Sequence, residues 1–206
     1  MGVLSHYSLL FLGAFLVYNI LLIRFIALCS FFGISNKMST SVGMGFAVIF
    51  VMTVSSAVSW VLFYGVLVKL GVQEFLYIPT FILVIAALVQ FEEMFIRKYS
   101  PSLYRAMGIY LPLITTNCAV LAAATESVKR GFLKLNIPYF YSFPESIVYT
   151  VGVAAGYAVV IVIFAGMRER IDIAPVPEWL KGPAIAFIAA ALMSLAFTGF
   201  ANLFGL

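Results

Sequence analysis

The chain has 206 residues, of which 64% are apolar and only 10% are charged. A soluble domain usually contains about 45–50% apolar and about 25% charged residues, so this composition excludes a soluble globular protein and indicates several membrane crossings. The net charge of +4 comes from lysines and arginines between apolar stretches. It indicates membrane topology and contact with lipid headgroups, and no nucleic-acid-binding surface.

Six stretches of the chain are apolar and long enough to cross a membrane, since each crossing needs about 20 residues. In chain order they lie at about 8–31, 43–68, 76–96, 105–125, 146–167 and 183–204. No window alternates between polar and apolar residues as a half-buried strand does. The sequence therefore predicts one all-α integral membrane domain, residues 1–206, with six transmembrane helices.

Similar segments occur in the second span of each half of the chain. Residues 45–51 read GFAVIFV and residues 156–162 read GYAVVIV, which indicates pseudo-repeats at about 1–100 and 101–206. Because three spans is an odd number, the second repeat must insert upside down, which gives an inverted 3+3 repeat. Basic residues are more frequent in the loops after the first, third and fifth spans. This bias places both termini on the extracytoplasmic side.

The two cysteines, Cys29 and Cys118, each lie inside an apolar span. A lone buried cysteine usually behaves as a small hydrophobic residue, and this spacing matches no zinc motif within one chain. Thiolates, however, select soft metals and iron–sulfur clusters, and a [2Fe–2S] cluster normally takes four of them. If these cysteines bind such a cluster, a second chain must supply the other two.

Polar residues near each cysteine predict that both helices are broken there. Thr115, Thr116 and Asn117 can satisfy free backbone groups before Cys118, and Pro112 removes one helical donor. A broken helix exposes N–H groups that can hydrogen-bond a thiolate or sulfide. In the first span, Asn19 can satisfy broken backbone in the same way.

Three charged residues in or beside the spans have two interpretations each. Arg24 either extends its side chain to the membrane interface or provides a fixed positive charge that raises the reduction potential of a cluster. Glu92 and Glu93 lie near the end of the third span. Glu93 either forms an ordinary helical ion pair with Arg97 or, with Glu92, belongs to an ion path.

Several motifs spread along the chain resemble one known family. They are LCSFFG at 28–33, SNK at 35–37, GMG at 43–45, QFEEM at 90–94, GIYLPLITTNCAVL at 108–121, RER at 168–170 and ALMSLAF at 191–197. Together they resemble the NqrDE/RnfAE family of membrane subunits, found in the Rnf electron-transport complex and in the sodium-pumping NADH:quinone reductase. The motifs at 116–121 and 90–93 favour its RnfA (RsxA) type, whereas FPESIVY at 143–149 favours its NqrE type. Segment 134–145 departs from the family pattern.

This resemblance implies a fold, a cofactor and a function. In the family, six helices form an inverted 3+3 repeat, and each protein pairs with a homologous, inverted, RnfE-like subunit. Cys29 and Cys118 would then be metal ligands, supplying half of an intramembrane [2Fe–2S] cluster. The chain would carry electrons across a bacterial or archaeal cytoplasmic (inner) membrane as part of an ion-translocating ferredoxin:NAD⁺ oxidoreductase, coupled to Na⁺ or H⁺ movement.

Catalysis by hydride transfer belongs to other subunits, which would carry the flavin, nucleotide and further iron–sulfur sites, because this sequence has no GxGxxG motif. An alternative of another class also remains. Six spans, an inverted repeat and broken helices suit a secondary transporter or a structural membrane subunit with inert cysteines. Iron bound through both cysteines would distinguish an electron-carrying subunit from a transporter or a structural subunit.

Overall fold

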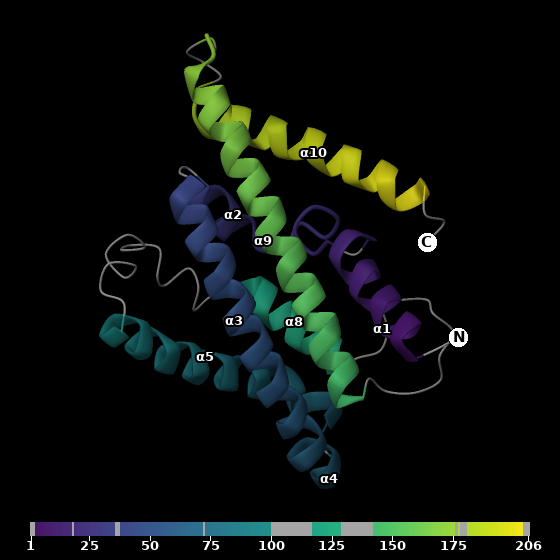
Figure 1. Cartoon of the computed structure of the whole chain (residues 1–206). Helices are drawn as coiled ribbons and strands as arrows, with labels where there is room; N and C mark the ends of the chain where they lie inside the picture. Colours follow the sequence, from purple (N-terminus) through teal and green to yellow (C-terminus); the bar gives the residue numbers. More distant parts are fainter. Residues whose placement is uncertain are drawn as a thin grey trace.

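The computed structural model describes residues 3–17, 19–35, 38–71, 73–99, 117–128, 142–175, 177 and 181–203. Every regular element within these residues is a helix, as Figure 1 shows, and this confirms the all-α prediction. The elements are α1 (Val3–Leu12), η1 (Gly13–Val17), α2 (Leu28–Ile34), α3 (Met38–Leu62), η2 (Phe63–Leu67), α4 (Val68–Leu70), α5 (Gln73–Tyr99), α8 (Cys118–Val128), α9 (Phe143–Ile173) and α10 (Pro183–Leu203).

Helices α3 and α9 form the centre of the fold, where they lie side by side and antiparallel (Figure 1). At one end the backbone N–H of Met38 donates to Oε1 of Glu169 at 2.9 Å, and at the other the rings of Trp60 and Phe143 are 5.2 Å apart. Small residues permit this approach, because a Cβ on Gly45 would lie 3.0 Å from the Cβ of Ala158. Helices with small interfacial residues pack closely in membranes in the same way.

The start of α9 is fixed by its own sequence. Ser142 and Glu145 form a capping box, in which the backbone N–H of Ser142 donates to Oε2 of Glu145 at 2.9 Å, and a proline follows in the first turn. As a result, α9 begins before residue 146, where the apolar run predicted the start of the fifth span.

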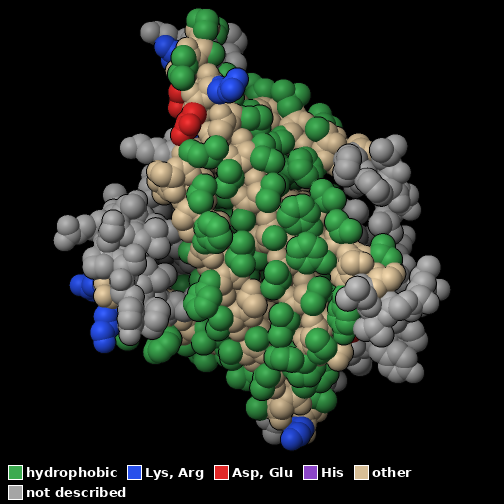
Figure 2. All heavy atoms as spheres, in the orientation of Figure 1, with side chains coloured by type: hydrophobic (Ala, Val, Ile, Leu, Met, Phe, Trp, Pro, Cys, Tyr) green, Lys and Arg blue, Asp and Glu red, His purple; other side chains and the backbone are tan. Residues whose placement is uncertain are grey.

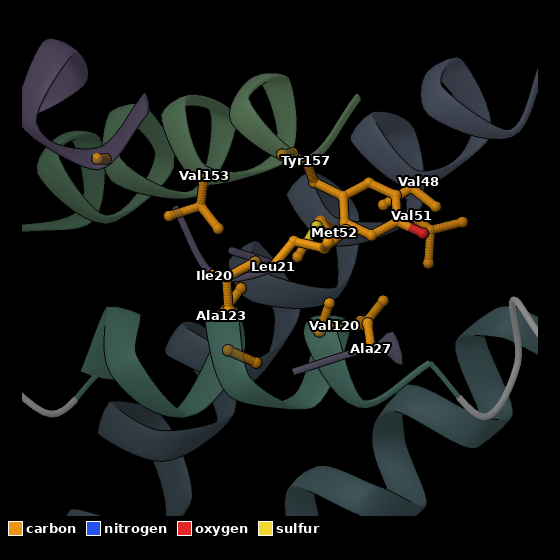
Figure 3. Close-up of a cluster of buried hydrophobic side chains, with 14 of the residues drawn as sticks. Ile20, Leu21, Ala27, Val48, Val51, Met52, Val120, Ala123, Val153 and Tyr157 are labelled. Carbon is orange, nitrogen blue, oxygen red and sulfur yellow. The ribbon is translucent and has the colours of Figure 1, made fainter. Parts of the chain in front are cut away.

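The core lies between α3, α8, α9 and the irregular segment 19–27. Figure 3 shows side chains from all four pointing toward one another, and the largest among them is the fully buried Tyr157. The labelled members are Ile20, Leu21, Ala27, Val48, Val51, Met52, Val120, Ala123, Val153 and Tyr157. This core fixes segment 19–27 against α8, which brings the two cysteine-bearing segments together.

The outer surface is also apolar, unlike that of a soluble protein. Figure 2 shows one face covered by hydrophobic side chains, with the visible charged groups at its margins. Phe46, Leu83 and Leu195 are among the most exposed, at 71%, 71% and 70%. Exposed apolar area of this extent is expected where lipid, or another membrane protein, covers the surface.

Two described helices are long and apolar enough to cross a membrane, Met38–Leu67 and Phe143–Ile173. Shorter apolar helices lie in the other four predicted spans, at Ser5–Leu16, Leu76–Phe91, Cys118–Val128 and Pro183–Gly199. The first span is not one continuous helix, because residues 19–27 separate η1 from α2. Of the fourth span, only the part from residue 117 onward is described. The inverted six-span arrangement therefore stays a prediction.

Candidate metal-binding site at the two cysteines

The irregular segment 19–27 is held in place by Asn19. Its Oδ1 accepts hydrogen bonds from the backbone N–H groups of Leu21 and Leu22 at 3.1 and 3.4 Å, and its Nδ2 donates to the carbonyl of Gly156 at 3.2 Å. Ser194 of α10 donates to the carbonyl of Leu22 at 2.7 Å. Backbone that leaves a helix inside a membrane needs such partners, since no water is present to replace them.

The end of this segment is strained and directs one N–H toward a sulfur atom. Phe25 and Ala27 have φ values of 54° and 70°, a left-handed conformation that non-glycine residues seldom adopt. The backbone N–H of Ala27 then donates to Sγ of Cys118 at 3.0 Å. The strained backbone therefore lies where Ala27 contacts Cys118, a residue 91 positions away in the sequence.

Each cysteine lies in the first turn of a helix. Cys29 is the second residue of α2, and Cys118 is the first residue of α8. Asn117 precedes α8, and its Oδ1 accepts the backbone N–H of Ala119 at 3.1 Å. The Nδ2 of Asn117 is buried and has no hydrogen-bond partner among the described residues. A donor is therefore left over beside Cys118.

The two thiols lie near enough to one another to interact electrostatically. Both cysteines are free and exposed. Beneath them, the buried hydroxyl of Tyr157 lies 2.9 Å from that of Ser30. Across the described part of the chain, no three His, Cys, Asp or Glu side chains come together as a complete metal site.

These residues fit half of a four-thiolate site. The two sulfurs are adjacent and open to the outside, so a second chain can approach them. The N–H of Ala27 and the spare amide of Asn117 are the kind of donors that hydrogen-bond thiolate and sulfide and thereby tune a cluster.

Arg24 forms an ion pair with Glu126, a residue at the end of the predicted fourth span. Glu126 belongs to α8, and it also accepts a hydrogen bond from the hydroxyl of Tyr149 at 2.9 Å. The side chains of Arg24 and Glu126 are only 20% and 15% exposed. An arginine within an apolar span needs a partner at similar depth, and that requirement was the signal pointing to Glu126.

The remaining predicted site residues are not brought to the cysteines by the described structure. Glu93 lies partly buried in the last two turns of α5. Thr115 and Thr116, and the side chain of Glu92, lie outside the described residues. The same holds for segment 134–145 as far as residue 141.

The RER motif at 168–170 makes specific contacts. Arg168 donates to the carbonyl of Phe32 at 2.8 Å and to the hydroxyl of Ser35 at 3.1 Å, and so satisfies the end of α2. Together with the contact from Glu169 to Met38, this fixes the end of α9 against both α2 and α3.

Comparisons with known proteins agree with the resemblance found in the motifs. A family described as "Rnf-Nqr subunit, membrane protein" matches residues 7–204. A protein of Proteus mirabilis, named as the A component of an ion-translocating oxidoreductase complex, is 50% identical over 202 residues, which cover 97% of this chain and 98% of that protein. Proteins of the same name from Pectobacterium carotovorum and Vibrio cholerae are each 48% identical, with 97% of this chain and 98% of the relative covered. The chain therefore belongs to the Rnf-Nqr family of membrane protein subunits.

Proposed function

We propose that this chain is the RnfA-type membrane component of an ion-translocating oxidoreductase complex and that it carries electrons across the membrane. Its relatives, matched over nearly their whole length, are named as the A component of such a complex. Within the complex, Cys29 and Cys118 hold half of a [2Fe–2S] cluster, and a homologous, inverted subunit supplies the other half. Electron transfer is coupled to the movement of Na⁺ or H⁺.

The observation that carries this proposal is the exposed pair of thiols with a backbone donor aimed at one of them. Two thiols alone cannot complete a cluster that takes four. Their exposure, in a protein with many exposed large apolar side chains, is what a site shared between two membrane chains requires. A cysteine that served only packing would be enclosed by its own chain, as free cysteines usually are.

The bound cluster would supply one-electron chemistry. The residues of this chain hold the two thiolates, donate the N–H of Ala27 to sulfur, and exclude water through the apolar core below. Hydrogen bonds to sulfur and burial are the two means by which a protein sets a cluster potential. Reactions of ferredoxin, NAD⁺ and flavins belong to neighbouring subunits.

The inverted six-helix arrangement belongs to the same proposal. Each cysteine lies in the first turn of a helix, α2 in the first half of the chain and α8 in the second. Equivalent placement in the two halves is what an inverted repeat around a midplane site predicts. We assign the protein to a bacterial or archaeal cytoplasmic (inner) membrane, with both termini on the extracytoplasmic side.

The test is the iron content of the purified complex. Cys29→Ala and Cys118→Ala should each lower it by about two irons and two acid-labile sulfides, since a [2Fe–2S] cluster lacking one thiolate is lost. Ser8→Ala is the control, because that exposed hydroxyl donates to the nearby carbonyl of Ser5 and to no other group among the described residues. Full iron content in both cysteine variants, with the complex still assembled, would contradict the proposal and favour a structural subunit or a transporter.

A further inference from the structure

A group of hydroxyls lies buried where α3, α8 and α9 meet. The Oγ of Ser56 is 3.0 Å from the Oγ of Ser127 and 2.9 Å from the Oγ1 of Thr150. Ser127 and Thr150 are fully buried, and Ser56 is 1% exposed. Polar groups at such positions in a membrane protein are costly, and they often mark a site on an ion or substrate path.

These three hydroxyls have three protons but make four close oxygen–oxygen contacts. Ser127 donates to the carbonyl of Ala124 at 2.8 Å, and Thr150 donates to the carbonyl of Ser146 at 2.8 Å. Ser56 has one proton and two neighbouring oxygens, because each hydroxyl is a donor only once. When Ser127 and Thr150 donate to these carbonyls, the single proton of Ser56 can serve only one of its two contacts. The other short oxygen–oxygen contact then has no proton between its atoms. The cluster is therefore rich in lone pairs and favours a positive charge.

Helix packing alone does not account for the surrounding hydroxyls. Thr53 shows the usual behaviour of such residues, since its hydroxyl donates to the carbonyl of Ile49 one turn back at 2.7 Å. The hydroxyls of Ser55, Ser59 and Ser146 are buried and have no hydrogen-bond partner among the described residues. They lie on α3 and α9, the helices that carry Ser56 and Thr150. The two helices therefore carry further buried hydroxyl oxygens besides those of the cluster.

The charge nearby suits a monovalent ion. Glu126 directly precedes Ser127, Tyr149 directly precedes Thr150, and the hydroxyl of Tyr149 donates to Glu126. Arg24 already pairs with this carboxylate, so little net negative charge remains. Small dications usually require several carboxylates, whereas neutral hydroxyl and carbonyl oxygens can replace the hydration of a singly charged ion. The close spacing of the oxygens favours a small ion.

We propose that Ser56, Ser127 and Thr150 form a binding site for Na⁺ inside the helix bundle. When the hydroxyl protons of Ser127 and Thr150 turn away, the carbonyls of Ala124 and Ser146 can also face the ion. The inference rests on the proposed function in one respect, since it names an ion and a site for the translocation activity. It depends on neither the cluster nor the cysteines.

The experiment measures the binding of ²²Na⁺ to the purified, assembled complex in excess K⁺. Thr150→Val replaces the hydroxyl by a methyl group of similar size, and Ser56→Ala removes the shared oxygen. Each should raise the half-saturating Na⁺ concentration by about tenfold, the effect of losing about 1.4 kcal/mol of interaction. Thr150→Ser keeps the hydroxyl and should bind Na⁺ as the unmodified protein does. Thr53→Val is the matched control on α3 and should also leave binding unchanged.

Unchanged ²²Na⁺ binding in both Thr150→Val and Ser56→Ala would overturn the inference and leave the hydroxyls as packing contacts. Should Ser56→Ala fail to assemble, Ser127→Ala provides the second variant. Iron content separates this result from a failure of the proposed function. The hydroxyl variants should keep their iron, and Cys118→Ala should lose iron while it retains this Na⁺ site.

Discussion

Replacing Glu126 by glutamine removes the carboxylate that pairs with Arg24. The pair joins α8, which begins with Cys118, to the irregular segment that leads to Cys29. Glutamine has nearly the same size and can still accept the hydrogen bond from Tyr149. The substitution therefore tests the contribution of the negative charge separately from the size and hydrogen bonding of the side chain.

The expected loss of stability follows from burial. Removing one partner of a buried ion pair costs about 3–5 kcal/mol, because the surviving charge remains uncompensated. Arg24 and Glu126 are 20% and 15% exposed, so solvent reduces this value somewhat. We expect Glu126→Gln to destabilise the protein by about 2–3 kcal/mol. A second substitution, Arg24→Gln, removes the positive charge as well and should restore part of that loss.

The assay is a double-mutant cycle on the free energy of unfolding, measured by denaturant titration of the complex in detergent micelles. The cycle should give a coupling energy of about 1–2 kcal/mol between Arg24 and Glu126. Glu93→Gln is the control, since the helical ion pair with Arg97 that the sequence predicts would contribute only a few tenths of a kcal/mol. A coupling energy below about 0.5 kcal/mol would refute the view that this ion pair joins the two segments.

Two further substitutions test the packing around the cysteines. Gly156→Ala would place a Cβ 2.7 Å from the carbonyl oxygen of Phe15, so we expect a loss of about 1–3 kcal/mol in unfolding free energy. Gly166→Ala is the control, because its Cβ would lie at an ordinary contact distance of 3.5 Å from the side chain of Met38. Equal losses of stability in Gly156→Ala and Gly166→Ala would contradict the close packing at Gly156. Asn19→Leu leaves two backbone N–H groups without their acceptor, which should cost about 2–4 kcal/mol and lower the cluster occupancy in iron assays. Normal stability and iron content in that variant would show that Asn19 does not hold the segment.

The composition of the chain was sufficient to predict an all-helical membrane protein, and local motifs were sufficient to recognise its family. A chain with 64% apolar and 10% charged residues has few alternatives to membrane helices. The motif around Cys118 and the other motifs indicated the family, to which the comparison over nearly the whole chain then assigned the protein. The capping box at Ser142 was also readable, and it would have placed the start of α9 correctly.

Other features depend on contacts between distant residues and could not be predicted locally. The strained backbone at Phe25 and Ala27 contains no glycine that would indicate it, and the N–H of Ala27 finds its acceptor on another helix. Glu126 stood at the predicted end of a span, and only the ion pair with Arg24 shows that it belongs to the interior. The hydroxyl cluster likewise combines residues from three helices.

The most direct test of the central claim is the EPR spectrum of the reduced complex, compared between the unmodified protein and Cys118→Ser. If Cys29 and Cys118 hold half of a [2Fe–2S] cluster, the unmodified complex contains one reduced-cluster signal that is altered or absent in Cys118→Ser, while the signals of other subunits remain. Identical spectra from two fully assembled complexes would contradict the claim.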